Sequence, residues 1–144
     1  MALLFIPACG NSNNSPTTPT PSSSVAGTWT GALSVEGQAA TMTWTLTETA
    51  GSSAVSGSML VALSDGEVLL NGTVTGTYAA PQLTYTVTVG PGAIPLQPSC
   101  TGQITGTANE TTTGTTTLSG SFSIVSSTCD SPIQTGPFTL TRSS

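Results

Sequence analysis

The sequence predicts an all-β fold, namely a single eight-stranded antiparallel up-and-down barrel, with a β-sandwich as the alternative. From Val25 onward, apolar residues alternate with Thr and Ser at a period of two, which is typical of strands with one buried face. The breaks between these strands are short, and short links favour antiparallel neighbours. Eight strands with no helix to cover a face are best satisfied by closure, which removes exposed edges.

The alternation defines each expected strand by its apolar positions. In chain order these are Trp29, Leu33 and Val35; Met42, Trp44 and Leu46; Val55, Met59 and Val61; Val68, Leu70, Val74 and Tyr78; Leu83, Tyr85, Val87 and Val89; Ile104; Leu118, Phe122 and Ile124; Phe138 and Leu140. Glycines recur in phase with these residues, and a narrow barrel needs glycine at sharp bends. Asp65-Gly66 predicts a type I′ hairpin turn with two positive φ angles. A turn is also expected from Asn109 to Gly114.

Two longer connections, from Gly90 to Ser99 and from Ser126 to Thr135, fall at the same barrel end because odd-numbered links of a meander share an end. Cys100 and Cys129 lie beside them, so we expect a disulfide between these two residues. Such a bridge would stabilise the fold by about 3–4 kcal/mol in the chain-entropy model. Free thiols or a metal site are the alternatives, although the chain has no His and no Cys-x-x-Cys spacing.

The N-terminus has a different composition. A short apolar run ends in small residues and Cys9, and a segment rich in Ser, Thr, Pro and Asn follows. This order resembles the end of a bacterial lipoprotein signal peptide with its lipidation cysteine. The resemblance implies a signal-peptide remnant at 1–8, a lipidated Cys9 with a flexible linker at 9–24, and a barrel domain at 25–144. The protein would then lie in the cell envelope, anchored to a membrane through lipid. The alternative is an apolar N-terminus with a chance cysteine.

Charge excludes several classes of function. The chain has one cation, Arg142, against six acidic residues, for a net charge of −5. It therefore lacks the basic face that nucleic-acid binding needs, and anionic membrane surfaces repel it. Without His or Lys it has no base for nucleophilic catalysis. A hydrolase that uses a pair of its six carboxylates is the formal alternative, but we expect no enzyme, no cofactor and no metal. Most acids lie in or beside turns; a weak cation site from Glu36, Asp65 and Asp130 at one barrel end is a minor alternative.

The first expected strand opens with Gly27-Thr28-Trp29, and Arg142 ends the last one. This pairing is similar to the calycin group, which includes lipocalins and avidin-like proteins. In those barrels a Gly-x-Trp opens the first strand, and a basic residue of the final strand packs over the indole. The resemblance implies barrel closure by Gly27, Trp29 and Arg142, with a cation–π contact worth about 0.5–2 kcal/mol. It does not identify a ligand.

Two functions remain open. The first is a lipid-anchored binding module that takes a small apolar ligand at the barrel mouth, with Ile94, Leu96, Trp44 and Tyr85 as candidate contacts. The second is a structural or surface-interaction lipoprotein that meets another envelope protein and has a fully packed core. The volume of the barrel interior distinguishes the two functions. The second function is favoured if the large inward side chains fill the interior, and these are Trp44, Met59, Leu70, Tyr85 and Phe122.

Overall fold

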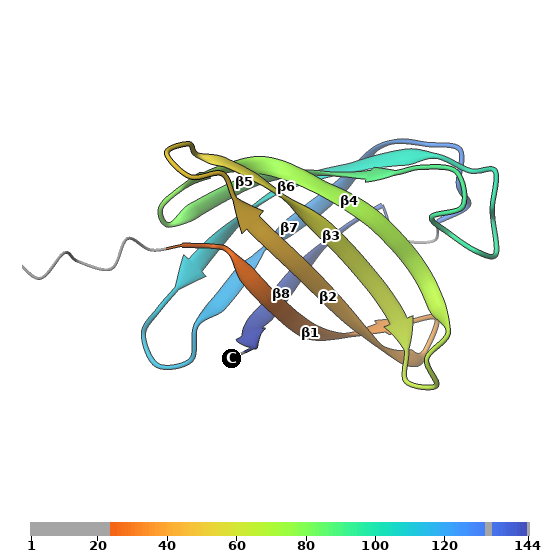
Figure 1. Ribbon diagram of the computed structural model, residues 1–144. Helices are drawn as coiled ribbons and strands as arrows, with labels where there is room; N and C mark the ends of the chain where they lie inside the picture. The colour runs from red at the N-terminus through yellow and green to blue at the C-terminus, as the bar shows by residue number, and fades with distance from the viewer. Residues whose placement is uncertain (1–23, 132–133, 144) are drawn as a thin grey trace, which may run out of the picture.

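A computed structural model describes residues 24–131 and 134–143 and shows a closed barrel of eight antiparallel strands in the order β1 to β8 (Figure 1). The predicted fold class is therefore confirmed. Cys9 and the rest of the expected signal and linker up to residue 23 lie outside the described residues. The strands are β1 (Gly27–Val35), β2 (Gln38–Glu48), β3 (Ala54–Leu63), β4 (Val68–Ala79), β5 (Gln82–Val89), β6 (Gly102–Thr111), β7 (Thr117–Ser127) and β8 (Thr135–Ser143).

The barrel has two unlike ends. At one end β1 begins and β8 finishes, and the two strands pair over only three positions, from Thr28↔Ser143 to Thr30↔Thr141. We call this end the seam pole. The opposite end, the loop pole, carries the long connection from β5 to β6 and the connection from β7 to β8, on the right in Figure 1. The up-and-down order places these odd-numbered connections together.

Inward-facing side chains fill the barrel. Trp44 is 1% exposed, and its ring lies 4.9 Å from that of Tyr85 and 5.3 Å from that of Phe138, between ring centroids. Glycine is required where the backbone of a neighbouring strand approaches closely. A Cβ on Gly57 would overlap the carbonyl oxygen of Thr45 across the β2–β3 ladder, so no other residue fits there.

The turn predicted at Asp65-Gly66 has a different geometry from the one expected. Gly66 has a φ of 94°, but Asp65 has no positive φ, so this is not a type I′ turn. The reason is local: the Asp65 carboxylate accepts the N–H of Glu67, and Leu63 pairs with Glu67 across a three-residue loop. The two consecutive positive φ angles occur instead at Glu36 (50°) and Gly37 (79°), between β1 and β2.

The expected turn from Asn109 to Gly114 starts too early, because β6 continues through Thr111. Asn109 to Thr111 pair with β7 from Ser119 to Thr117, so the ladder extends further than the composition of this stretch suggests. This extension places Glu110 inside a strand, where its side chain is buried.

A β-bulge interrupts β7 near the loop pole. Ile104 pairs with Ile124 and Gln103 with Ser126, so Val125 has no opposite residue on β6. The bulge leaves Val125 57% exposed and bends the strand locally.

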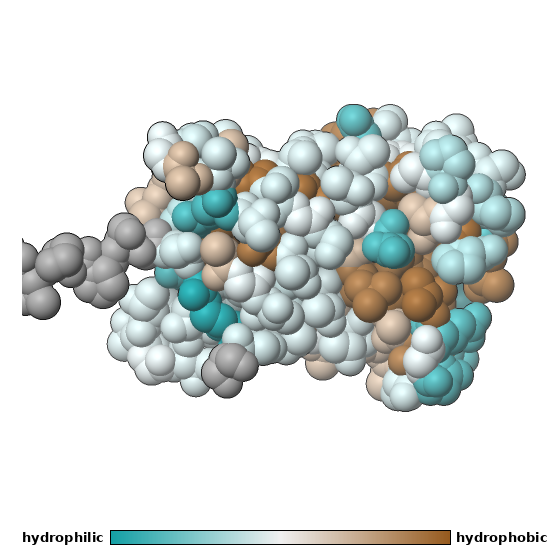
Figure 2. Space-filling view, in the orientation of Figure 1, coloured by the Kyte–Doolittle hydropathy of each residue, from teal (hydrophilic) through white to brown (hydrophobic). Residues whose placement is uncertain are grey.

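The surface of the barrel is weakly polar. Figure 2 shows white and pale blue over most of one face, with a brown patch toward the right-hand end.

Candidate functional site

At the seam pole the structure brings together Trp29 and Arg142. The Arg142 guanidinium carbon lies 4.5 Å from the centroid of the Trp29 ring, which is fully buried. Nη2 of Arg142 donates to the Ser24 carbonyl and lies 3.5 Å from Oε2 of Glu110. Gly27 opens β1 with a φ of 132°, a backbone conformation that favours glycine. Arg142 thus joins the first strand, the last strand and β6.

Sequence reasoning missed the part that Val25 plays in this closure. Val25 is fully buried, its N–H donates to Oε1 of Glu48 at 2.6 Å, and its carbonyl accepts from Nε1 of Trp29 at 2.9 Å. Val25 therefore fills space at the seam pole and fixes the position at which the chain enters the barrel. The only signal for it was the first apolar residue after the Ser/Thr/Pro-rich segment.

Glu110 is the one buried charged residue in the described part of the chain, with a side chain that is 3% exposed. Burial raises the pKa of its carboxyl, and the Glu48 carboxylate acts in the same direction. The Arg142 charge and a hydrogen bond with Tyr78 lower the pKa, but the net shift is upward. A signal was present in the sequence, because Glu110 is in phase with the inward Ala108 of the same strand.

Trp44 and Tyr85, two of the candidate ligand contacts, lie in the packed core. Tyr85 is 2% exposed, and its hydroxyl donates to the Ser121 carbonyl at 2.8 Å. Burial raises the pKa of Tyr85 well above its usual range, so the phenol stays protonated. The two rings hold each other in an edge-to-face contact, which leaves them no free face to offer a ligand.

The other two candidates, Ile94 and Leu96, lie in the loop over the loop pole. Ile94 is half-buried and lines a cavity of about 90 Å³ at the mouth of the barrel. The apolar part of the lining also includes Leu70, Val89, Ile104 and Ile124, and the polar part includes Gln103, Ser126 and Ser127. Leu96 is 72% exposed. The N–H of Asn71 on β4 donates to the Ala93 carbonyl at 2.8 Å, which fastens the loop to the barrel. The loop thus acts as a lid.

Three connections hold the two long loops together. Cys100 and Cys129 form a disulfide. The Gln97 carboxamide donates to the Asp130 carbonyl at 3.0 Å and accepts the Asp130 N–H at 2.8 Å. Thr128 pairs with Thr101 through both backbone and side chain. The loop pole is therefore a braced surface built from two segments far apart in sequence.

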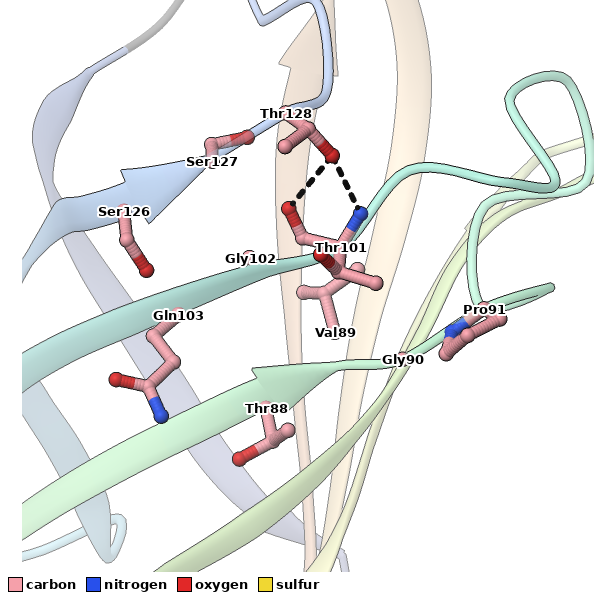
Figure 3. A pocket seen from close by; sticks show the side chains of 10 residues that line it. All are labelled: Thr88, Val89, Gly90, Pro91, Thr101, Gly102, Gln103, Ser126, Ser127 and Thr128. Carbon is pink, nitrogen blue, oxygen red and sulfur yellow. Dashed lines mark hydrogen bonds between the residues drawn. The ribbon is translucent and has the colours of Figure 1, made fainter.

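A larger hollow, of about 730 Å³, lies beside this brace on the ends of β5, β6 and β7 (Figure 3). We call it the outer groove. Its polar lining is Thr88, Thr101, Gln103, Ser126, Ser127 and Thr128. Gly90, Pro91, Val89 and Gly102 complete it, so the groove has no ionisable side chain. No residue singled out from the sequence as a ligand contact lines it, because a surface hollow depends on how three strands bend.

The remaining candidates do not form a site. Among the residues that the structure describes, no group of three or more His, Cys, Asp or Glu side chains could hold a metal ion. The described part of the chain also has no helix that could cross a membrane.

Comparison with known protein families, with curated proteins and with solved structures finds no match to the chain. The eight-stranded antiparallel barrel is compatible with a calycin-like fold. A fold alone does not assign the chain to a family.

Proposed function

We propose that this protein is a non-enzymatic, lipid-anchored binding module of the bacterial cell envelope that acts through its outer surface at the loop pole. The observation that carries the proposal is the contrast between the two hollows. The cavity of about 90 Å³ beside Ile94, which shares Gln103, Ser126 and Ser127 with the outer groove, is far below the roughly 300–1,000 Å³ of ordinary ligand pockets. The outer groove of about 730 Å³ is open to solvent and rests on a braced support.

The packed interior favours the surface-interaction alternative over an apolar ligand at the mouth. Trp44, Met59 and Tyr85 are each at most 5% exposed, and Ile94 closes the loop pole above the remaining space. An apolar molecule of more than a few heavy atoms would have to displace this lid and its hydrogen bond to Asn71.

The position of the first described residue supports an orientation of the barrel. Ser24, the first described residue, lies at the seam pole, where Arg142 binds its carbonyl. A lipid on Cys9 would therefore attach to the barrel through this end, and the loop pole would point away from the membrane. The net charge of −5 disfavours any other contact with an anionic membrane.

Two measurements test the proposal. Cys9→Ser should release the protein from the membrane fraction of its host; a variant that stays bound would show that the anchor lies elsewhere. A photo-crosslinking residue at Gln103, in the groove, should capture an envelope component in intact cells. The matched control is Thr75, which is exposed on β4. Equal capture at both positions, or none at Gln103, would contradict the proposal.

A further inference from the structure

The outer groove contains a row of polar side chains with unused hydrogen-bonding groups. Thr88 on β5 pairs with Gln103 on β6, and Gln103 pairs with Ser126 on β7, so the three stand side by side across three strands (Figure 3). All three are exposed, and none makes a side-chain hydrogen bond within the described chain. Together they offer two hydroxyls and a carboxamide, which donate and accept.

The polar residues next to this row, toward the loop pole, already have hydrogen-bond partners within the protein. Oγ1 of Thr128 accepts the N–H of Thr101 at 2.9 Å and donates to its carbonyl at 3.3 Å, and the Ser127 hydroxyl bonds to the backbone of Cys129. The Cys100–Cys129 disulfide braces this part of the lining. The part of the lining next to the brace is therefore held in place, and the adjacent row of Thr88, Gln103 and Ser126 presents free donors and acceptors.

Glycine leaves room for a ligand in the groove. A Cβ placed on Gly90 would meet no atom within 4 Å, so the groove is open above this residue. Gly102 lies between Val89 and Ser127 in the same strand register and contributes only backbone to the lining. The backbone can thus be approached closely.

The lining selects a class of ligand. It has no charge to bind an anion or a cation, and its apolar side chains are only Val89 and Pro91, too few for the aromatic and aliphatic anchors of a protein interface. Uncharged donors and acceptors in a row match a molecule that carries many hydroxyl or acetamido groups. Adjacent strands lie about 4.8 Å apart, so the row spans roughly 10 Å. The strand spacing of about 4.8 Å is close to the length of one sugar unit along an extended glycan, so the whole row matches about two units.

We infer that the outer groove binds a neutral oligosaccharide, with Thr88, Gln103 and Ser126 as its hydrogen-bonding contacts. The inference rests on the proposed function, since it names the ligand class of the same surface. Gln103 takes the central position, where its carboxamide spans neighbouring hydroxyl groups.

Titration of the full chain with chitotetraose and with cellotetraose tests this inference, with heparin as the charged comparison. We expect binding of at least one neutral tetrasaccharide at millimolar concentration and no binding of heparin. Gly90→Trp should abolish binding by filling the groove, and Gln103→Ala should weaken it roughly 2- to 10-fold through lost hydrogen bonds. Thr75→Trp is the matched control. Thr75 is exposed on β4 and does not line the groove, so this variant should bind like the wild type.

The inference is overturned if neither tetrasaccharide binds, if heparin binds better, or if folded Gly90→Trp and Gln103→Ala variants both bind like the wild type. Its failure is distinguishable from failure of the proposed function. Crosslinking from Gln103 in cells without saccharide binding in solution would leave a binding module whose ligand is of another class. Saccharide binding that depends on Gln103 would stand even if the chain proved not to be lipid-anchored.

Discussion

The indole nitrogens of the two tryptophans meet different surroundings. Nε1 of Trp29 donates to the Val25 carbonyl at 2.9 Å. Nε1 of Trp44 is buried, and in the part of the chain that the structure describes it has no hydrogen-bond partner. An unsatisfied buried donor costs about 1–3 kcal/mol, whereas a satisfied one contributes modestly to stability.

Replacing each tryptophan by phenylalanine separates these two effects. Both side chains are almost fully buried and lose the same atoms, so the two substitutions create comparable cavities. We expect Trp29→Phe to lower the free energy of unfolding by about 1–3 kcal/mol more than Trp44→Phe, because it also leaves the Val25 carbonyl unpaired and thins the Arg142 contact. Urea unfolding of both variants measures the difference. Equal losses would show that the Val25 hydrogen bond contributes nothing.

The carboxyl of Glu110 predicts a specific pH dependence. Its pKa is raised from 4.5 in the folded protein, so the folded state holds this proton more tightly than the unfolded chain does. Its contribution to stability is complete below the unfolded-state pKa and is lost as pH rises through the folded-state value. Relative to Glu110→Gln, the wild type should therefore lose stability as the pH rises above 4.5, the ordinary pKa of the carboxyl.

Urea unfolding at several pH values checks this prediction. Glu67→Gln is the matched control, because Glu67 is exposed in the β3–β4 turn and its removal should leave the curve unchanged in shape. Parallel curves for the wild type and Glu110→Gln would show that the Glu110 carboxyl keeps the same pKa on folding.

At the scale of elements, the β5–β6 connection combines a buried and an exposed apolar residue. Ile94 lines the interior cavity, whereas Leu96 is 72% exposed two residues later. The loop is fastened at Asn71 on β4 and at Asp130 in the next long loop. Of these two side chains, only Ile94 contributes to the role of the loop as a lid.

Ile94→Ser should destabilise the fold by about 1–2 kcal/mol, because a half-buried apolar side chain is exchanged for a hydroxyl above an apolar cavity. Leu96→Ser, the matched control in the same loop, should stay within about 0.5 kcal/mol of the wild type. Thermal or urea unfolding compares the two. If Leu96→Ser is the more destabilising change, Leu96 is the residue that closes the barrel.

The strands and their inward faces were predictable because period two records burial directly, and the Cys100–Cys129 pairing followed from the topology of the meander. Turn type was harder: Asp65-Gly66 has the composition of a type I′ turn, but the Asp65 carboxylate stabilises a longer loop. The outer groove was not predictable, since it depends on the bend and the Val125 bulge in β7, which depend on register and not on residue type.

For the whole molecule, the two poles of the barrel have different roles. At the seam pole the single cation of the chain, Arg142 on the last strand, packs on Trp29 of the first strand and contacts Glu110. Val25 is held there by Glu48 and Trp29. The loop pole uses a disulfide and the Gln97 carboxamide to brace an uncharged groove. Between them lies a core with room for little beyond its own side chains. The central claim is that binding occurs outside the barrel and not inside it.

Residue-resolved NMR of the isotope-labelled full chain tests that claim most directly. Spectra are recorded after addition of a lipid extract of the host envelope and then after addition of a water-soluble digest of its wall. We predict that the digest shifts the amide signals of Gly90, Gln103 and Ser126, and that the lipid extract leaves the indole signal of Trp44 unchanged. Shifts of Trp44 and Tyr85 on addition of lipid, with the groove signals unmoved by the digest, would contradict the account and place the ligand in the barrel interior.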